Sequence, residues 1–238
     1  MKEHRQIRLD ARLSAVATSV REGVRLIDVG TDHAYLPIRL VSEGTVPYAV
    51  ASDIAQGPLR KAREAVREAG LDDRVETVLC DGLSGISLSP PCDIVIAGMG
   101  GETIAAILEG RPEVKHPDIR LILQPMTKAA FLRGFLCGNG FSIDSERIAG
   151  ERKLYPIFLC RYTGERVELS PLELAFGREG SRVEDALFFR YVREKLKARK
   201  LAAEGRARAG KEKEEDRLFF EEAARLLERE APSDRPRT

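Results

Sequence analysis

Short apolar runs alternate with amphipathic stretches along roughly the first two thirds of the chain. The runs at 26–29, 48–54, 74–80, 93–97 and 119–124 lack polar alternation, which is typical of parallel strands that are covered on both faces. Between them, apolar residues recur every three or four positions, as on the inner face of a helix. Segments 141–148 and 154–162 predict an antiparallel pair at the sheet edge. The pattern predicts a seven-stranded, doubly wound α/β sheet.

The amino-terminal segment has its own helical pattern. Apolar residues at helical spacing predict an amphipathic helix that ends at Gly23 and packs on the sheet beside the first strand; they are Leu9, Leu13, Val16, Ala17 and Val20. The arginines that lie mostly between them are interpreted as a solvated face rather than an RNA contact. These arginines are Arg5, Arg8, Arg12 and Arg21.

Beyond Gly164 the pattern changes to long, highly charged helical sequence. Two apolar stripes with Gly205 and Gly210 between them predict an antiparallel helical hairpin. The first stripe is Val183, Leu187, Tyr191, Val192, Leu196 and Leu201, and the second is Leu218, Phe219, Ala223, Leu226 and Leu227. We therefore expect two domains, residues 1–164 and residues 165–238.

Charge is segregated along this predicted hairpin. Residues 189–213 hold ten Lys or Arg against three Glu, a balance of +7, whereas residues 214–230 hold three Arg against seven acids, a balance of −4. The opposite charges can simply pair the two helices. Alternatively, the basic helix grips a phosphate backbone through Arg190, Arg193, Lys197, Lys200, Arg206 and Arg208.

The composition sets limits on the class of protein. The formal net charge of the 238 residues is +1, so the chain as a whole carries no strong field that would indicate nucleic acid. No apolar run approaches the roughly 18 residues of a membrane span, and the polar start of the chain does not resemble a signal peptide. We expect a cytoplasmic protein. Its four cysteines and three histidines are too scattered for a metal site, and the cysteines are expected to be reduced thiols.

Candidate chemistry gathers where the first strand ends. Asp28, Gly30, Asp32, His33 and Tyr35 follow one another there, and Thr31 or Asp32 is expected to cap the helix over 34–41. In open α/β sheets ligands bind outside the carboxyl ends of the strands, so these residues would face one crevice. An ordinary strand-to-helix turn without a ligand is the alternative.

This corner does not carry the Gly-x-Gly-x-x-Gly fingerprint of dinucleotide binding. Asp32 and His33 occupy positions where a pyrophosphate needs bare backbone, which disfavours a nicotinamide dehydrogenase. A carboxylate repels phosphate and attracts an ammonium or sulfonium group. The corner therefore favours S-adenosylmethionine as the ligand.

Later strand ends extend the same crevice. Asp53 ends the second strand 23 residues after Gly30, a spacing at which an acid accepts bonds from ribose hydroxyls, with Ile54 beside it. Asp81, followed by Gly82, can accept a hydrogen bond from an adenine amino group, although a plain turn explains this pair equally well.

The fourth strand runs into a glycine-rich loop, 98–101. Three glycines in four residues suggest that a group approaches the backbone closely, and the loop would face the reactive methyl. The loop lacks the Asn or Asp with prolines that commonly accept bonds from an exocyclic amine. A ring nitrogen, which needs no such acceptor, is therefore indicated as the methyl acceptor.

Two of these motifs resemble the bacterial TrmK family of tRNA (adenine(22)-N(1))-methyltransferases. They are Asp-x-Gly-Thr-Asp-His-Ala-Tyr-Leu-Pro at 28–37 and Ala-Gly-Met-Gly-Gly at 97–101. The resemblance extends over nearly the whole chain, and it implies a Rossmann-like, seven-stranded class I methyltransferase sheet with a coiled-coil domain that helps to hold tRNA. Gln-Pro at 124–125 is usually followed by Asn in that family, whereas Met126 follows here.

The resemblance and the residues together suggest specific roles. The cofactor would be held by Asp28, Gly30, Asp53, Ile54, Asp81, Gly82 and Gly98, and the target base would meet Asp32, His33, Tyr35, Gly98 and Met99. Tyr35 would stack on the base, His33 would bond near its reacting edge, and Asp32 would stabilise the developing positive charge. Another RNA position, or a non-catalytic RNA-binding module that keeps the nucleotide-binding shape, remain the alternatives.

Overall fold

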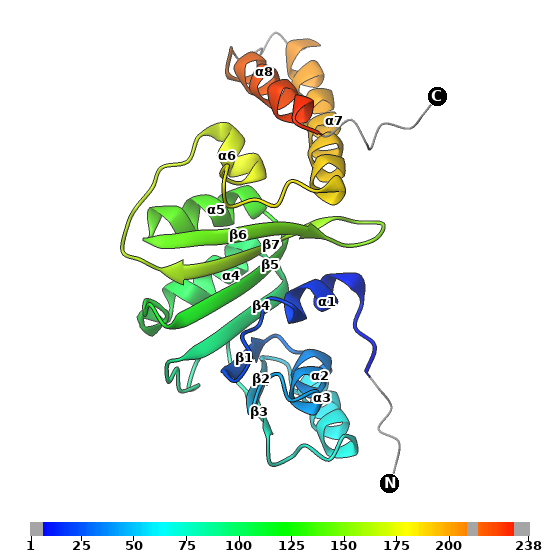
Figure 1. Cartoon of the computed structure of the whole chain (residues 1–238), viewed down its shortest axis with the longest axis vertical. Coiled ribbons are helices and arrows are strands. Elements are labelled where there is room, and N and C mark those ends of the chain that lie inside the picture. Colours follow the sequence, from blue (N-terminus) through cyan, green and yellow to red (C-terminus); the bar gives the residue numbers. More distant parts are fainter. Residues whose placement is uncertain (1–6, 209–213, 231–238) are drawn as a thin grey trace.

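A seven-stranded sheet forms the centre of the protein, a computed structural model of which describes residues 7–208 and 214–230 (Figure 1). The strand order is β3-β2-β1-β4-β5-β7-β6. The strands are β1 Arg25–Val29, β2 Ala49–Asp53, β3 Val75–Leu79, β4 Cys92–Gly100, β5 Ile119–Thr127, β6 Phe141–Ala149 and β7 Tyr155–Tyr162. The helices are α1 Ala11–Ala17, α2 Tyr35–Ser42, α3 Gln56–Glu68, α4 Gly101–Glu109, α5 Ala129–Gly138, α6 Pro171–Phe176, α7 Ala186–Arg208 and α8 Glu214–Glu228, with a short 3-10 turn at Pro112–Val114.

The order and direction of the strands confirm the predicted seven-stranded, doubly wound sheet with an antiparallel pair at its edge. Strands β1 to β5 are parallel, and β7 runs antiparallel between β5 and β6. The chain leaves β1 toward β2 on one side and returns to β4 on the other. Because successive connections diverge at this point, a crevice is expected outside the carboxyl ends of β1 and β4.

Both faces of the sheet are covered by helices, as the apolar runs predict. Leu26 faces the layer formed by α1, α2 and α3, whereas its neighbour Ile27 faces α4 and α5 (Figure 1). Val95 and Ile94 on the central strand β4 divide in the same way. Alternate residues of a strand point to opposite faces, so two buried faces require an apolar residue at nearly every position.

The amino-terminal helix is shorter than predicted, and two of its predicted solvent-facing arginines are buried in part. Helix α1 ends at Ala17, before Gly23. The guanidinium of Arg21 bonds Asp93, a fully buried carboxylate, with Nε and Oδ1 2.7 Å apart, and Arg12 bonds the buried Gln124. The solvated-face interpretation is wrong for these two residues, because buried polar groups need partners. Arg8 is exposed as expected, and Arg5 lies outside the described residues.

The start of α2 also differs from its predicted capping. Its N-cap is Ala34, which has a positive φ of 55° and no side-chain capping bond. Thr31 does not cap the helix, because its hydroxyl donates to Asp28 Oδ2 at 2.6 Å. Asp32 does not cap it either and has a φ of 53°. The turn is therefore held by the carboxylate of the strand rather than by a cap.

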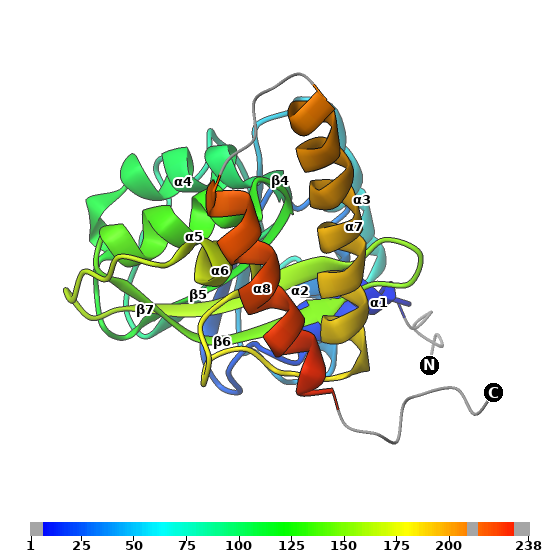
Figure 2. The ribbon, with the colours of Figure 1, turned by 90° about the horizontal axis from the view of Figure 1, so that it is seen from above.

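The predicted helical hairpin is formed by α7 and α8, which lie side by side over one end of the sheet (Figure 2). Its apolar stripe continues into the sheet, because Phe188, Val192 and Phe219 share one buried cluster with Ile148 of β6 and with Leu154, which directly precedes β7. Gly205 lies inside α7 rather than at the turn, and Gly210 falls outside the described residues. Val183, Leu201 and Leu218 of the predicted stripes are exposed.

A buried ion pair joins the sheet to the segments that lead into the hairpin. Arg133 of α5 and Glu146 of β6 form a bidentate pair with both side chains almost completely buried. Arg133 also donates to the backbone oxygens of Leu174, at 2.7 Å, and Ala175, at 3.1 Å, in α6. The backbone of Glu146 pairs with residues 181 and 183, which lead into α7. One charged pair therefore fixes three elements that precede the hairpin.

Candidate active site

The carboxyl ends of β1, β2, β4 and β5 bring most of the predicted residues together. Asp28 and Gly30 come from the end of β1 and Asp53 from the end of β2, while Gly98 and Met99 belong to β4. The neighbouring strand β5 adds Gln124, to which sequence analysis assigned no role. Since parallel strands end at the same edge, these groups lie at one edge of the sheet, where a ligand crevice is expected.

Asp28 is the buried acid of this crevice. Its side chain is 7% exposed and accepts the hydrogen bond from Thr31. Burial raises its pKa to about 6, with a further increase from Asp53, while the Thr31 bond and the positive charge of Arg12 work in the opposite direction. At neutral pH the group is mainly ionised, and it carries a charge that burial has made costly. Such a carboxylate is stabilised by a cationic ligand.

Asp53 holds the turn after β2 and leaves acceptor capacity toward the crevice. Its Oδ1 accepts from the backbone N–H of Ala55 at 2.8 Å, and its Oδ2 lies 3.4 Å from the backbone nitrogen of Asp32. An ionised carboxylate has about four acceptor positions, so ribose hydroxyls can still be bound. Ile54 is 67% exposed beside it, and Asp81 is exposed in the turn after β3. An apolar surface next to two acids suits an adenosine.

His33 and Tyr35 stand together at the mouth of the same corner. Their rings are stacked, with centroids 5.1 Å apart and planes 15° from parallel. His33 Nε2 lies 3.5 Å from Asp32 Oδ2, and Tyr35 is 43% exposed. The left-handed backbone of Asp32 and Ala34 produces the sharp turn that sets the two rings side by side.

The glycine-rich segment continues β4 instead of forming a separate loop. Gly98 has a φ of 85°, and its N–H donates to Gln124 Oε1 at 3.1 Å within an irregular stretch of the β4–β5 ladder. A side chain at Gly30 would collide with the terminal methyl of Met99, and one at Gly101 would collide with the backbone of Lys128. The close approach at these two glycines therefore comes from the protein itself.

Arg12, Gln124 and Met126 lie beside the predicted site residues, and sequence analysis assigned none of them a role in the site. Arg12 donates to Gln124 Oε1 at 2.7 Å, so that oxygen accepts from both Arg12 and Gly98. The amide nitrogen of Gln124 lies 3.7 Å from the sulfur of Met126. A polar residue that directly follows the apolar run of β5 was the available signal for Gln124. Nothing local marks Arg12.

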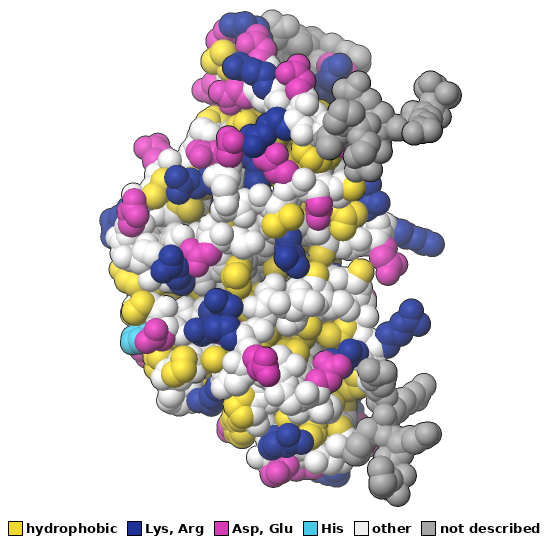
Figure 3. Space-filling model, viewed as in Figure 1, with side chains coloured by type: hydrophobic (Ala, Val, Ile, Leu, Met, Phe, Trp, Pro, Cys, Tyr) yellow, Lys and Arg dark blue, Asp and Glu magenta, His cyan; other side chains and the backbone are white. Residues whose placement is uncertain are grey.

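Of the predicted RNA-contacting cations on α7, two are bonded within the protein and two are exposed without such a partner among the residues that the structure describes. Arg190 bonds the backbone oxygen of Glu151 at 2.6 Å, and Arg193 pairs with Glu230. Lys197 and Lys200 are exposed, and neither forms an ion pair within the described ranges. The side chains of Arg206 and Arg208 fall outside the described part of the chain. In Figure 3, basic and acidic side chains are interspersed over the hairpin at the top of the view.

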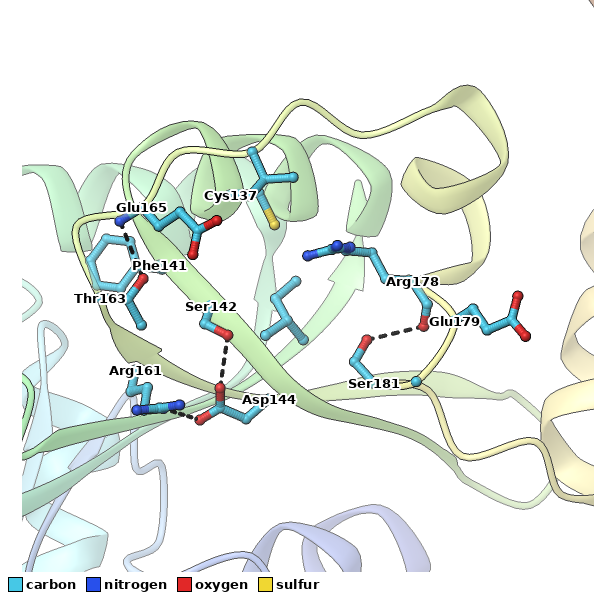
Figure 4. A pocket seen from close by; sticks show the side chains of 13 residues that line it. Cys137, Phe141, Ser142, Asp144, Arg161, Thr163, Glu165, Arg178, Glu179 and Ser181 are labelled. Atoms are coloured by element: carbon cyan, nitrogen blue, oxygen red, sulfur yellow. Dashed lines mark hydrogen bonds and ion pairs between the residues drawn. The ribbon is translucent and has the colours of Figure 1, made fainter.

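A cavity of about 610 Å³ lies at the opposite edge of the sheet (Figure 4). It is bordered by the amino-terminal end of β6, whose Phe141 pairs with Tyr162 beside the start of β5. Its polar groups bond one another: Asp144 accepts from Ser142 and from Arg161, each at 2.8 Å. Because it is remote from the carboxyl ends of the parallel strands, it is not the crevice of the predicted site.

Three other features are absent from the residues that the structure describes: a metal-binding cluster, a disulfide and a membrane-spanning helix. Within 7–208 and 214–230, no group of three or more His, Cys, Asp or Glu is arranged to hold a metal ion. All four cysteines are free, and burial raises the pKa of each thiol. No described helix has the length and apolar character that crossing a bilayer requires.

Comparison with known proteins agrees with this geometry. The methyltransferase domain family matches residues 9–158. The tRNA (adenine(22)-N(1))-methyltransferase of Bacillus subtilis (strain 168) is 35% identical over 162 residues, which are 68% of each chain.

Solved structures extend the likeness over the hairpin. Streptococcus pneumoniae Sp1610 in complex with S-adenosyl-L-methionine is 32% identical, with a TM-score of 0.74 over 91% of this chain and 97% of that one. M. capricolum TrmK in complex with S-adenosyl-homocysteine is 25% identical, with a TM-score of 0.71 over 92% of this chain and 95% of that one. The acidic first corner, the conformation of the sheet and these likenesses lead to one conclusion: the chain belongs to the TrmK family of tRNA (adenine(22)-N(1))-methyltransferases.

Proposed function

We propose that this protein transfers a methyl group from S-adenosylmethionine to N1 of adenine 22 in tRNA. The observation that carries the proposal is the acidic corner formed by Asp28 and Asp53 at the point where the strand order reverses, in a chain of the TrmK family. Two carboxylates at this corner repel a pyrophosphate and attract a cationic nucleoside. The reaction is an in-line displacement, which needs alignment rather than a covalent intermediate on the protein.

The residues present fit this cofactor. Asp28, buried and ionised at neutral pH, would face the ammonium of the methionine moiety beside Gly30. Asp53 would accept from the ribose hydroxyls, and the exposed side chain of Ile54 would pack on adenine. Asp81 and Gly82, in the turn after β3, would close the adenine side. When bound, the cofactor supplies an electrophilic methyl on a sulfonium.

The protein's own contribution to catalysis is positioning. Neutral adenine carries a lone pair on N1, so no general base is required, and alignment of the reacting atoms can supply several kcal/mol. Tyr35 would stack on the extruded base and His33 would bond near its reacting edge, while Gly98 and Met99 form the floor. The product base is cationic, and the carboxylate of Asp32 at the mouth would stabilise that charge.

The hairpin supplies the hold on tRNA in this proposal. Lys197 and Lys200 are exposed on α7, where they can meet a phosphate backbone. Arg190 and Arg193 would have to leave their present partners first. The division into a cofactor-binding domain, residues 1–164, and a tRNA-contacting domain, residues 165–238, is part of the proposal, as is a location in the cytoplasm with the tRNA pool.

Mass mapping of nucleosides tests the function directly. The protein is incubated with S-adenosylmethionine and tRNA transcripts that carry adenine or guanine at position 22, and the RNA is digested and analysed. One 1-methyladenosine per adenine-22 transcript is expected, with none in the guanine-22 transcript. Methylation of both transcripts, or of neither, would rule out this target.

The contribution of the basic helix requires charge reversal rather than truncation, because removing the hairpin would uncover Ile148 and Leu154. The double variant Lys197→Glu/Lys200→Glu should weaken tRNA binding and flatten its dependence on salt. The matched control Lys61→Glu/Lys115→Glu changes two exposed lysines outside the hairpin by the same charge. Equal affinities of the two double variants for tRNA would show that Lys197 and Lys200 of α7 do not contact the RNA.

A further inference from the structure

A cavity of about 290 Å³ lies between the catalytic sheet and the hairpin. Residues 125–130, which end β5 and begin α5, form one wall, and α7 and α8 form another. Leu154 and the first two residues of β7, Tyr155 and Pro156, complete the lining beside Phe176 of α6. The volume is near the lower end of ligand pockets, about 300 Å³. None of the roles assigned above uses it.

This cavity adjoins the methyl-transfer crevice. In the β4–β5 ladder Met99 is the register partner of Pro125, and Gly100 is the register partner of Thr127. Adjacent strands lie about 4.8 Å apart, so the crevice floor and the cavity wall are one strand spacing from each other. The sulfur of Met126, a lining residue that is 41% exposed, contacts the amide of Gln124, which in turn bonds Gly98.

The chemistry of the lining suits a nucleotide. Three cations, Lys128, Lys195 and Arg199, border the cavity, and no Asp or Glu is among its lining residues. Lys128 pairs with Glu102 at 3.7 Å and Arg199 with Asp216 at 3.4 Å, both outside the lining, whereas Lys195 contacts only the Tyr191 ring among the interactions of the described residues. Two of the cations lie over aromatic rings: Lys195 Nζ is 5.2 Å from the Tyr191 ring centre, and the Arg199 guanidinium carbon is 3.7 Å from that of Phe219. Aromatic and apolar walls with a cationic rim are the features by which proteins bind unstacked bases and their phosphates.

We propose that this cavity binds the nucleotide adjacent to the target adenine. Its base packs between Tyr155 and Met126, and its phosphate lies on Lys195 and Lys128. Extruding the target base bends the RNA backbone at that point, and a second pocket one strand away holds the bent chain. The inference rests on the proposed function, and it adds a specificity-determining site between the crevice and the hairpin.

Two variants test the site. Lys195→Glu changes an exposed residue, and Tyr155→Ala removes the half-buried ring. Each should raise the KM for tRNA about tenfold or more, while the KM for S-adenosylmethionine stays unchanged. Lys61→Glu, an exposed lysine on α3, is the matched control and should keep the wild-type KM for tRNA. Thermal melting of each variant checks that the fold is retained.

An abasic substrate identifies the occupant. Transcripts that lack the base on the 5′ or the 3′ side of the target adenine are compared with the intact transcript. One of the two should show the raised KM with the wild-type protein, and on that transcript Tyr155→Ala should have no further effect. Equal effects of Tyr155→Ala on all three transcripts would overturn the assignment of a base to this cavity.

Equilibrium binding keeps the inference separate from the proposed function. If the wild-type protein transferred no methyl to tRNA, the proposed function would fail, and fluorescence anisotropy with labelled tRNA would still compare Lys195→Glu with Lys61→Glu. Weaker binding of Lys195→Glu alone supports the cavity as an RNA site. If both pocket variants bound tRNA as the wild type does and kept its KM for tRNA, the inference would be overturned. That result would be expected if the cavity receives a protein segment instead of RNA.

Discussion

Arg12 and Gln124 are 112 residues apart in the sequence, and a 2.7 Å hydrogen bond joins the guanidinium of the first to the amide oxygen of the second. The same oxygen accepts from the N–H of Gly98 in β4. Gln124 is fully buried, so its orientation depends on these donors. The amino-terminal helix thereby positions the strand end that, on the proposed function, faces the target base.

Replacement of Arg12 should therefore lower catalysis without unfolding the protein. Arg12→Ala leaves Gln124 with one donor fewer, and loss of a hydrogen bond to a charged group corresponds to about a 10- to 100-fold decrease in kcat/KM. Gln124→Ala should have a similar effect, and the double variant should be no worse than the more severe single variant. Arg8→Ala, which alters an exposed arginine nearby, is the control. Additive losses would show that the two residues act independently.

Asp53 should dominate cofactor affinity. Asp53→Ala removes the acceptor for the ribose hydroxyls, and calorimetry should show a Kd for S-adenosylmethionine that is about 100-fold higher. Asp72→Ala, in the exposed turn before β3, provides a matched loss of one carboxylate. An unchanged Kd for Asp53→Ala would remove the ribose assignment.

Ionised Asp28 should lower the free energy of unfolding while it strengthens binding of S-adenosylmethionine. The loss of stability should depend on pH. Its pKa rises from 3.8 in the unfolded chain to about 6 in the folded protein, so the folded state binds the proton more tightly. The associated stabilisation is present below pH 3.8 and is lost as pH rises through 6, a difference of about 3 kcal/mol. Asp28→Asn should therefore raise the free energy of unfolding at pH 8 by up to about 3 kcal/mol, and by much less at pH 4.

Urea unfolding at the two pH values measures this difference, and calorimetry should show that Asp28→Asn also weakens binding of S-adenosylmethionine. Asp72→Asn serves as the control for removal of one exposed charge. A stability difference that is the same at pH 4 and pH 8 would contradict the burial of an ionised Asp28.

Tyr35 should contribute to turnover of tRNA and not to the affinity for the cofactor. Base–aromatic stacking is worth about 1–3 kcal/mol, so Tyr35→Ala should reduce kcat/KM on tRNA by about 5- to 150-fold while calorimetry shows wild-type cofactor binding. Tyr35→Phe keeps the ring that stacks on His33 and should retain most of the activity. Retained turnover in Tyr35→Ala would reject it as a substrate contact.

The buried pair of Arg133 and Glu146 should respond strongly to loss of one charge. Glu146→Gln keeps the shape but leaves the guanidinium without its counter-charge, which costs about 3–5 kcal/mol of unfolding free energy. The double variant Arg133→Met/Glu146→Gln should recover part of the loss, and Glu168→Gln on an exposed site should change little. Denaturant unfolding of the four proteins checks the order. A single variant as stable as the wild type would show that the pair is solvated.

The sheet was predictable because each buried parallel strand leaves an uninterrupted apolar run, and the acids at the ends of β1 and β2 are adjacent in sequence to such runs. The small helix α6 was missed although Ser170 and Glu173 form a capping box, with Pro171 between them, which is a local signal. The left-handed backbone of Asp32 and Ala34 has no such signal, because neither is glycine.

Long-range partners were beyond sequence reasoning. The helix predicted to end at Gly23 places Arg12 and Arg21 outside its apolar stripe. An arginine that reaches a buried acceptor occupies the same positions in such a pattern as an arginine that stays in solvent. Only the fold brings Asp93 and Gln124 within hydrogen-bond distance of them. Apolar periodicity records which face of a helix is buried and contains no information about the partners of its polar residues.

The charged pair between α5 and β6 has a consequence for how a substrate is chosen. It anchors the segment that precedes α7, and the apolar cluster of α7 and α8 continues into the β6–β7 pair, so the hairpin and the crevice keep a set separation. On the proposed function, a tRNA seated on the hairpin presents to the crevice only those bases that lie at that span. The enzyme would then select its adenine by the distance between that base and the part of the folded RNA that the hairpin binds.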